Sequence, residues 1–271
     1  MTEALPAQDV SPGTLQEWLK YWRSRVDPRR IPGLDASDRR KQGLNQDEVA
    51  RLIGVTTRWY QELESGRRLF STSHLERLAL TLRLSEPEQR ALYLMASHKA
   101  PQPKGTTDTA ALAALDAPMQ KLLDVQLPHP AYLSDTAWNI IGSNAPQTDW
   151  FPWVPYEPNL MRWAFLYPEA REQLVNWRDD WARPFLAQIH YALAEHPDNE
   201  DLHKLVADIR EGNPEARKIW DSHEVQVHPD GDERRLRLPY HGSKEVPVHI
   251  MALAPLRNPA MRFIVLMAAD D

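Results

Sequence analysis

The sequence predicts two domains, a small all-α domain of five helices and a larger α+β domain with an antiparallel sheet and inserted helices. Apolar residues recur at helical spacing from Leu15 to Met95, whereas the end of the chain alternates apolar and polar residues as strands do. A segment rich in Pro, Gly and Thr separates the two patterns and is typical of a linker. We therefore assign residues 14–98 to the first domain, 99–108 to the linker and 109–271 to the second domain.

The composition is that of a globular protein, because 42% of the 271 residues are hydrophobic and 26% are charged. The chain has no cysteine, which excludes disulfides, thiol nucleophiles and thiolate metal sites. The N-terminus lacks the features of a secretory signal, and no apolar run approaches the ~20 residues of a membrane span. We expect a soluble, cytoplasmic protein.

Charge is distributed unevenly along the chain. Residues 1–104 carry 17 Lys and Arg against 13 Asp and Glu, a net charge of +4, whereas residues 105–271 carry 15 against 25, a net charge of −10. A basic first domain suits contact with nucleic acid, and an acidic second domain alone would be repelled by phosphate.

Five helices are expected in the first domain. The first covers residues 15–25 and is followed by a loop whose cations either contact phosphate or face solvent: Arg29, Arg30, Arg39, Arg40 and Lys41. In the segment 42–68, Asn45 and Glu48 form a capping box, Gly54 ends one short helix and Thr56 caps the next, which predicts a helix-turn-helix. A helix at residues 74–82 follows, and a second capping box, Ser85 with Glu88, opens a fifth helix that runs through Met95 and contains Leu92 and Leu94.

The second domain is expected to begin with a helix at residues 110–125 and a β-hairpin on either side of Ser134 and Asp135. An aromatic, proline-rich loop at 147–159 leads to helices at 159–167, 169–196, 199–211 and 214–223. Pro184 should kink or divide the longest of these. Strands are expected at 234–240, 246–253 and 261–267.

Two resemblances cover nearly the whole chain. The motifs QDEVA (46–50), GVT (54–56) and LESG (63–66) resemble the lambda-repressor-like (XRE) DNA-binding domain, over residues 15–95. The motifs PAYLSDTAWNIIGSN (130–144) and NLMRWAFLYPEAR (159–171), with the strand-rich end, resemble the MmyB-like ligand-binding domain. The second resemblance implies a PAS-like fold, although the last strands are more irregular than is usual in that family.

The first resemblance implies that the second helix of the helix-turn-helix enters the major groove. Thr57, Arg58 and Glu62 would then face bases, with Gln61 close by. Arg58 suits guanine, Thr57 a thymine methyl, and Glu62 either accepts from cytosine or orients Arg58. Trp59 would pack on a sugar or methyl group or against the neighbouring loop. The remaining candidates would contact phosphates: Gln46, Thr56, Arg67 and Arg68. A homodimer on an inverted-repeat operator of double-stranded DNA is expected.

Seven of the ten tryptophans lie between Trp138 and Trp220. They form either an aromatic core or the wall of an apolar pocket. The second resemblance favours a pocket for a small, fatty-acid-like ligand, with the 147–159 loop as a lid. Arg162 would meet a ligand carboxylate or remain a surface cation. The candidate ligand-binding residues are Trp138, Asn139, Trp153, Arg162, Trp163, Leu166, Trp177, Trp181 and Phe185.

Enzyme motifs such as GxSxG, HExxH, a Walker A loop and GxGxxG are absent from the sequence. His223 and His228 near Glu224 have poor spacing for a metal, so no cofactor or metal is expected. We predict a DNA-binding transcription regulator whose second domain senses a small apolar ligand. The alternative is a second domain that serves only dimerisation or partner docking; a hydrolase is a third interpretation, without a catalytic constellation to support it.

Overall fold

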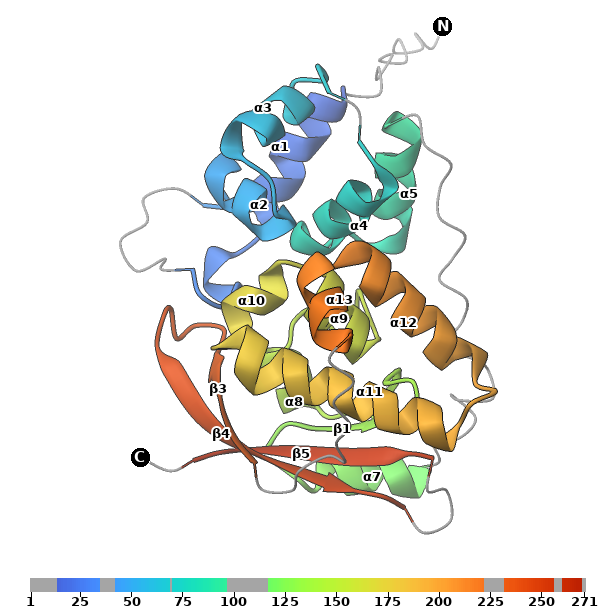
Figure 1. Cartoon of the computed structure of the whole chain (residues 1–271). Helices are drawn as coiled ribbons and strands as arrows, with labels where there is room; N and C mark the ends of the chain where they lie inside the picture. Colours follow the sequence, from blue (N-terminus) through green and yellow to red (C-terminus); the bar gives the residue numbers. More distant parts are fainter. Residues whose placement is uncertain are drawn as a thin grey trace, which may run out of the picture.

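The computed structural model describes residues 14–34, 42–68, 70–96, 117–221, 232–255 and 260–269. Figure 1 shows a small helical domain seated on a layer of helices, with an antiparallel sheet beneath that layer and one further helix under the sheet. The predicted order, an all-α domain followed by an α+β domain with an antiparallel sheet, is confirmed. The predicted linker lies outside the described residues.

The first domain contains the five expected helices: α1 (Leu15–Arg25), α2 (Gln46–Ile53), α3 (Thr57–Glu64), α4 (Thr72–Thr81) and α5 (Glu86–Met95). Helix α4 begins before residue 74 because Ser71 caps it, its hydroxyl accepting a bond from the His74 amide. In α5, Leu92 is fully buried, whereas Leu94 is 68% exposed. Residues two apart point to opposite sides of a helix, so only one of the pair can enter the core.

The second domain mixes helices and strands in the expected order. Its elements are α7 (Ala117–Asp124), β1 (Ala131–Ser134), β2 (Ile140–Ser143), α8 (Ala145–Trp150), α9 (Leu160–Leu166), α10 (Glu169–Gln173), the π-helical turn η2 (Trp177–Ala182), α11 (Arg183–Glu195), α12 (Glu200–Gly212), α13 (Pro214–Trp220), β3 (Asp232–Arg237), β4 (Glu245–Leu253) and β5 (Arg262–Ala268). The first part of the helix expected at 110–125 lies outside the described residues.

The sheet is antiparallel throughout, with strand order β2-β1-β5-β4-β3. Because side chains alternate along a strand, each face has its own core. On one face Tyr132 pairs with Ile264, and this face packs against the helical layer that contains α11. On the other face Leu133 and Phe263 pack with Leu123 of α7. The sheet is therefore covered by helices on both sides (Figure 1).

Two expectations for the helical layer were wrong in detail. The segment 169–196 is not one helix: it breaks after Gln173, where Leu174 bridges to Leu236 of β3 and Asn176 adopts a left-handed φ of 51°. Pro184 lies in the first turn of α11, where a missing N–H costs little. The 147–159 loop is partly helical, because Asn144 caps α8 and Pro146 fits its first turn.

The two domains are in direct contact. Arg77 of α4 donates to the Leu166 carbonyl of α9 at 3.0 Å, and Arg83 pairs with Glu169 of α10. Leu80 of α4 is part of the core of the second domain. Within the described residues, no helix is long and apolar enough to cross a membrane.

Candidate DNA-reading helix and ligand-binding core

Local hydrogen bonds build the helix-turn-helix as the sequence predicts. The Asn45 side chain accepts from the Glu48 amide at 2.9 Å, and the Glu48 carboxylate accepts from the Asn45 amide at 2.8 Å. Gly54 ends α2 with a φ of 77°, and the Thr56 hydroxyl accepts from the Trp59 amide at 3.2 Å. These contacts set the angle at which α3 leaves α2.

The two faces of α3 differ sharply. Tyr60 and Leu63 are fully buried in the domain core, whereas the Arg58 side chain is 89% exposed. Glu62 accepts from Arg68 at 2.9 Å and from Arg58 at 3.3 Å. The Arg68 and Arg58 guanidinium groups hold the pKa of the Glu62 carboxyl below its usual range. This arrangement fits the interpretation that Glu62 orients Arg58.

Polar side chains at the start of α2 connect to α3. Gln61 donates to the Gln46 side chain at 3.3 Å, and Gln46 donates to Glu64 at 3.0 Å. Glu64 is 2% exposed and pairs with Arg23 of α1 at 3.1 Å. The structure therefore brings Gln46 and Gln61 together and fixes them to the domain core through a buried carboxylate.

The remaining candidates for DNA contact lie around this surface. The Thr57 hydroxyl donates to Asp47 at 2.5 Å, and Arg67 donates to the Ser65 hydroxyl at 3.0 Å. The Trp59 ring lies 4.4 Å from the His74 ring of α4, with the Arg68 guanidinium 5.4 Å from its centre. Trp59 thus packs within its own domain, against α4 and Arg68, and its predicted role at the DNA stays a prediction.

Four of the five predicted ligand-binding tryptophans form a dense aromatic layer. Trp153 and Trp163 are fully buried and stack 4.2 Å apart. Trp177 donates to the Ala164 carbonyl at 2.8 Å, and Trp181 donates to the Val175 carbonyl at 3.1 Å. Phe185 lies 5.8 Å from Trp181, and Leu166 packs at the edge of the same core. These rings contact one another and the backbone.

Three further candidates, Asn139, Trp138 and Arg162, contact other side chains of the same domain. Asn139 donates from its amide and its side chain to Asp135, at 2.9 and 2.8 Å, and so stabilises the β1–β2 turn. Trp138, in the same turn, lies under Arg262 at 4.0 Å. Arg162 pairs with Asp208 and, at 3.5 Å, with Glu157. Its side chain is 24% exposed, so it is more buried than the surface cation considered for it.

Sequence reasoning missed Arg234 of β3. This residue is 2% exposed, and its guanidinium lies 5.0 Å from the Trp181 ring and 5.6 Å from Phe185. The signal was present, because Arg234 and Leu236 are two apart on a strand and share its inward face. Arg234 and Arg262 both act on Tyr132: burial raises the pKa of that phenol, and the two guanidinium groups oppose the rise.

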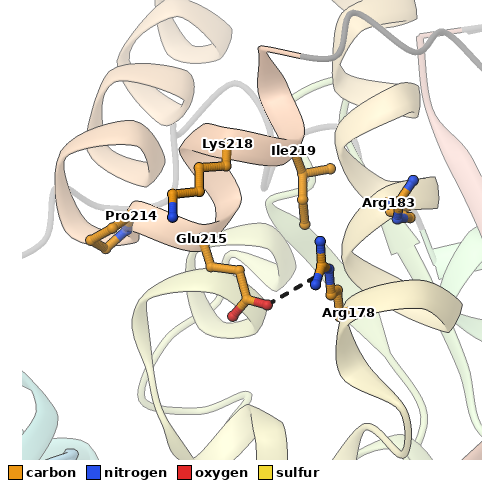
Figure 2. A pocket seen from close by; sticks show the side chains of 6 residues that line it. All are labelled: Arg178, Arg183, Pro214, Glu215, Lys218 and Ile219. Carbon is orange, nitrogen blue, oxygen red and sulfur yellow. Dashed lines mark ion pairs between the residues drawn. The ribbon is translucent and has the colours of Figure 1, made fainter.

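Two cavities are described. One, of about 470 Å³, lies between η2, α11 and α13, and Figure 2 shows its lining by Arg178, Arg183, Pro214, Glu215, Lys218 and Ile219. Glu215 projects toward Arg178 there, with their nearest charged atoms 3.9 Å apart. The other, of about 320 Å³, lies between the two domains. None of the predicted ligand-binding residues lines either cavity, so that set stays a prediction.

The described residues contain no group of three or more His, Cys, Asp or Glu side chains that could hold a metal ion. His223, Glu224 and His228 lie outside the described residues.

The chain combines a helix-turn-helix, whose outer face is exposed, with an α+β domain that has helices on both faces of its sheet, and two family models identify this combination as a ligand-responsive transcription regulator. The chain belongs to the MmyB-like transcription regulator family: the model of the MmyB-like transcription regulator ligand binding domain matches residues 115–271. A model of a helix-turn-helix domain matches residues 37–92. No curated protein matches the chain.

Proposed function

We propose that this regulator binds an inverted-repeat operator as a homodimer and that a fatty-acid-like ligand in its second domain changes the affinity for that operator. The observation that carries the proposal is the outer face of α3, where Arg58 is 89% exposed while the apolar face of the helix is buried. A helix with this division can enter the major groove without disturbing its own domain.

Each predicted contact has a distinct role in this proposal. Arg58 donates two hydrogen bonds to guanine, and Glu62 holds its guanidinium in place. Gln46, at the start of α2, binds a phosphate and positions Gln61. Arg67 and Arg68 follow α3 and contact the phosphate backbone, so they add affinity that does not depend on sequence.

The ligand is proposed to lie between α11 and the face of the sheet that carries Tyr132. Apolar side chains of β4 and β5 and the rings of Trp181 and Phe185 belong to the buried core at this face, and the alkyl chain is proposed to pack among them. Arg234 and Arg262 place two buried or largely buried cations at the same face, and these favour an acid over a neutral lipid.

Helix α10 connects the proposed ligand site to the DNA-binding domain. After it, the Val175 amide donates to the Arg235 carbonyl of β3 at 3.2 Å. On its other side, Glu169 pairs with Arg83, and Glu172 lies 3.7 Å from Arg51 of α2. A shift of β3 on ligand binding would therefore move the support of the helix-turn-helix, and such coupling is typically about 1–3 kcal/mol.

The test begins with selection of an operator from random duplexes, followed by binding titrations with and without laurate, myristate or palmitate. Methyl palmitate serves as the neutral control. We expect an acid to raise the melting temperature and to change operator affinity, and Arg234→Gln to weaken both effects. If saturating acid changes neither quantity and organic extracts of the purified protein contain no lipid, the second domain is a dimerisation or docking module.

A further inference from the structure

The cavity between the two domains is separate from the proposed fatty-acid site. Its lining combines α4, the α4–α5 turn and α5 with the loop after α8 and the end of α9. The contributing residues are Glu76, Ala79, Leu80, Leu84, Ser85, Glu86, Gln89, Arg90, Tyr93, Pro155, Tyr156, Pro158 and Tyr167. Its volume of about 320 Å³ is that of a small-molecule site.

Three tyrosines define the chemistry of this cavity. Tyr93 is 2% exposed and lines the cavity, and the described residues show no hydrogen bond from its hydroxyl, which is not among their fully buried unpaired polar atoms. Tyr167 is also buried and donates to the Glu157 carboxylate at 3.0 Å. The third ring, Tyr156, already has the Arg83 guanidinium 5.8 Å from its centre. Tyrosine faces attract cations, and a tyrosine hydroxyl that lines a cavity can hydrogen-bond to a ligand there.

The charged residues in the described lining are Glu76, Glu86 and Arg90, and the Arg83 guanidinium lies beside this lining, over the Tyr156 ring. Arg90, the one cation among the lining residues that the structure describes, pairs with Glu86 at 2.9 Å. Glu76 has no ion-pair partner among the described residues, and its carboxylate adds to burial in raising the pKa of both Tyr93 and Tyr167. An anion entering here would be repelled by Glu76, whereas a cation would gain a carboxylate and aromatic faces.

We propose that this interdomain cavity binds a small organic ammonium ion. The ammonium group contacts Glu76 and the tyrosine rings, while its carbon skeleton packs on Ala79, Leu80 and Leu84. Because the ligand touches both domains, its binding stabilises their contact and adds a second input to operator binding. This inference does not depend on the identity of the ligand in the α11–sheet layer.

Isothermal titration calorimetry on the full chain tests the proposal. The probes are 2-phenylethylamine, 1,5-diaminopentane and tetramethylammonium, and the controls are 2-phenylethanol and 3-phenylpropanoate. We expect at least one ammonium probe to bind saturably, one per chain, and neither control to do so. The proposal is overturned if none of the ammonium probes binds saturably. It is also overturned if the neutral or the anionic control binds as tightly as the ammonium probes.

Two variants locate the site. Glu76→Gln should weaken ammonium binding by about tenfold, the effect of one charge-assisted contact, and Tyr93→Phe should weaken it while keeping the ring. Glu233→Gln, which changes an exposed carboxylate on β3, should bind as the parent does. Melting temperatures confirm that each variant is folded. Unchanged affinity in both folded cavity variants assigns the bound ammonium to another place and overturns the proposal.

Discussion

Arg83 and Glu169 form a two-point ion pair across the boundary between the domains. The Arg83 Nη1 atom lies 3.1 Å from Glu169 Oε2, and Nη2 lies 2.5 Å from Oε1. Their side chains are 14% and 1% exposed. Arg83 reaches this position from a turn with a φ of 52°, and Glu169 is the first residue of α10. The DNA-binding domain is therefore fixed to the start of the helix that also contacts β3.

Replacing Arg83 with alanine should destabilise the protein strongly, because the Glu169 carboxylate would remain buried without its cation. Breaking a buried pair in this way costs about 3–5 kcal/mol. Urea unfolding of Arg83→Ala measures the loss. The control is Arg90→Ala, which breaks an exposed pair and should cost about 0–1 kcal/mol. Similar losses in the two variants would mean that the interdomain pair contributes no more than a surface pair.

Gly54 and Gly66 offer a second test of the domain contact. Both have a left-handed φ, 77° and 75°, so alanine at either position incurs about 1–2 kcal/mol of backbone strain. A Cβ at residue 54 would also lie 2.8 Å from the Pro168 side chain of the second domain, whereas a Cβ at residue 66 meets nothing within 4 Å. Gly54→Ala should therefore lower the melting temperature more than Gly66→Ala. Equal decreases in melting temperature would show that the Pro168 side chain moves aside without a loss of stability.

Local signals explain why much of the first domain could be predicted. The Asn45–Glu48 box and the αL position at Gly54 depend on residues a few positions apart, and these interactions have strong sequence preferences. The position of the Trp59 ring depends instead on a contact with His74, which belongs to another helix. Its packing could not be derived from the spacing within α3.

A contact with a distant part of the chain also explains the break in the helix after Gln173. Residues 169–196 have a helical pattern, but Leu174 bridges to Leu236, far along the chain, and this tertiary contact overrides local propensity. The aromatic layer was predicted from composition, whereas its ring-on-ring packing follows from the fold. Asn139 was predicted on the hairpin as part of a pocket wall, and its bonds to Asp135, which stabilise the β1–β2 turn, could not be derived from that pattern.

Arg58→Ala should weaken binding to the matched operator by about 1–3 kcal/mol and relax specificity at one base pair, because the lost contact is to a base edge. Gel-shift titrations on the matched operator and its single-base variants measure both effects. Arg67→Ala is the control: it should weaken binding to all duplexes alike and lower the salt dependence. Equal losses on every sequence for Arg58→Ala would exclude base reading by this side chain.

Glu88 predicts a pH dependence of folding. Its bonds with Arg25, at 2.6 and 2.9 Å, and with the Ser85 amide lower its pKa from the ordinary 4.5 to about 2. A lowered pKa in the folded state stabilises the protein above pH 4.5, and this contribution disappears as the pH falls through about 2.

Glutamine keeps the helix cap but not the charge, so Glu88→Gln should lose about 1 kcal/mol at neutral pH, since water screens the pair. Urea unfolding at several pH values should show the two proteins converging in strong acid. In an Arg25→Ala background the substitution should matter much less, and an undiminished effect there would assign the stabilisation to the cap rather than to the ion pair.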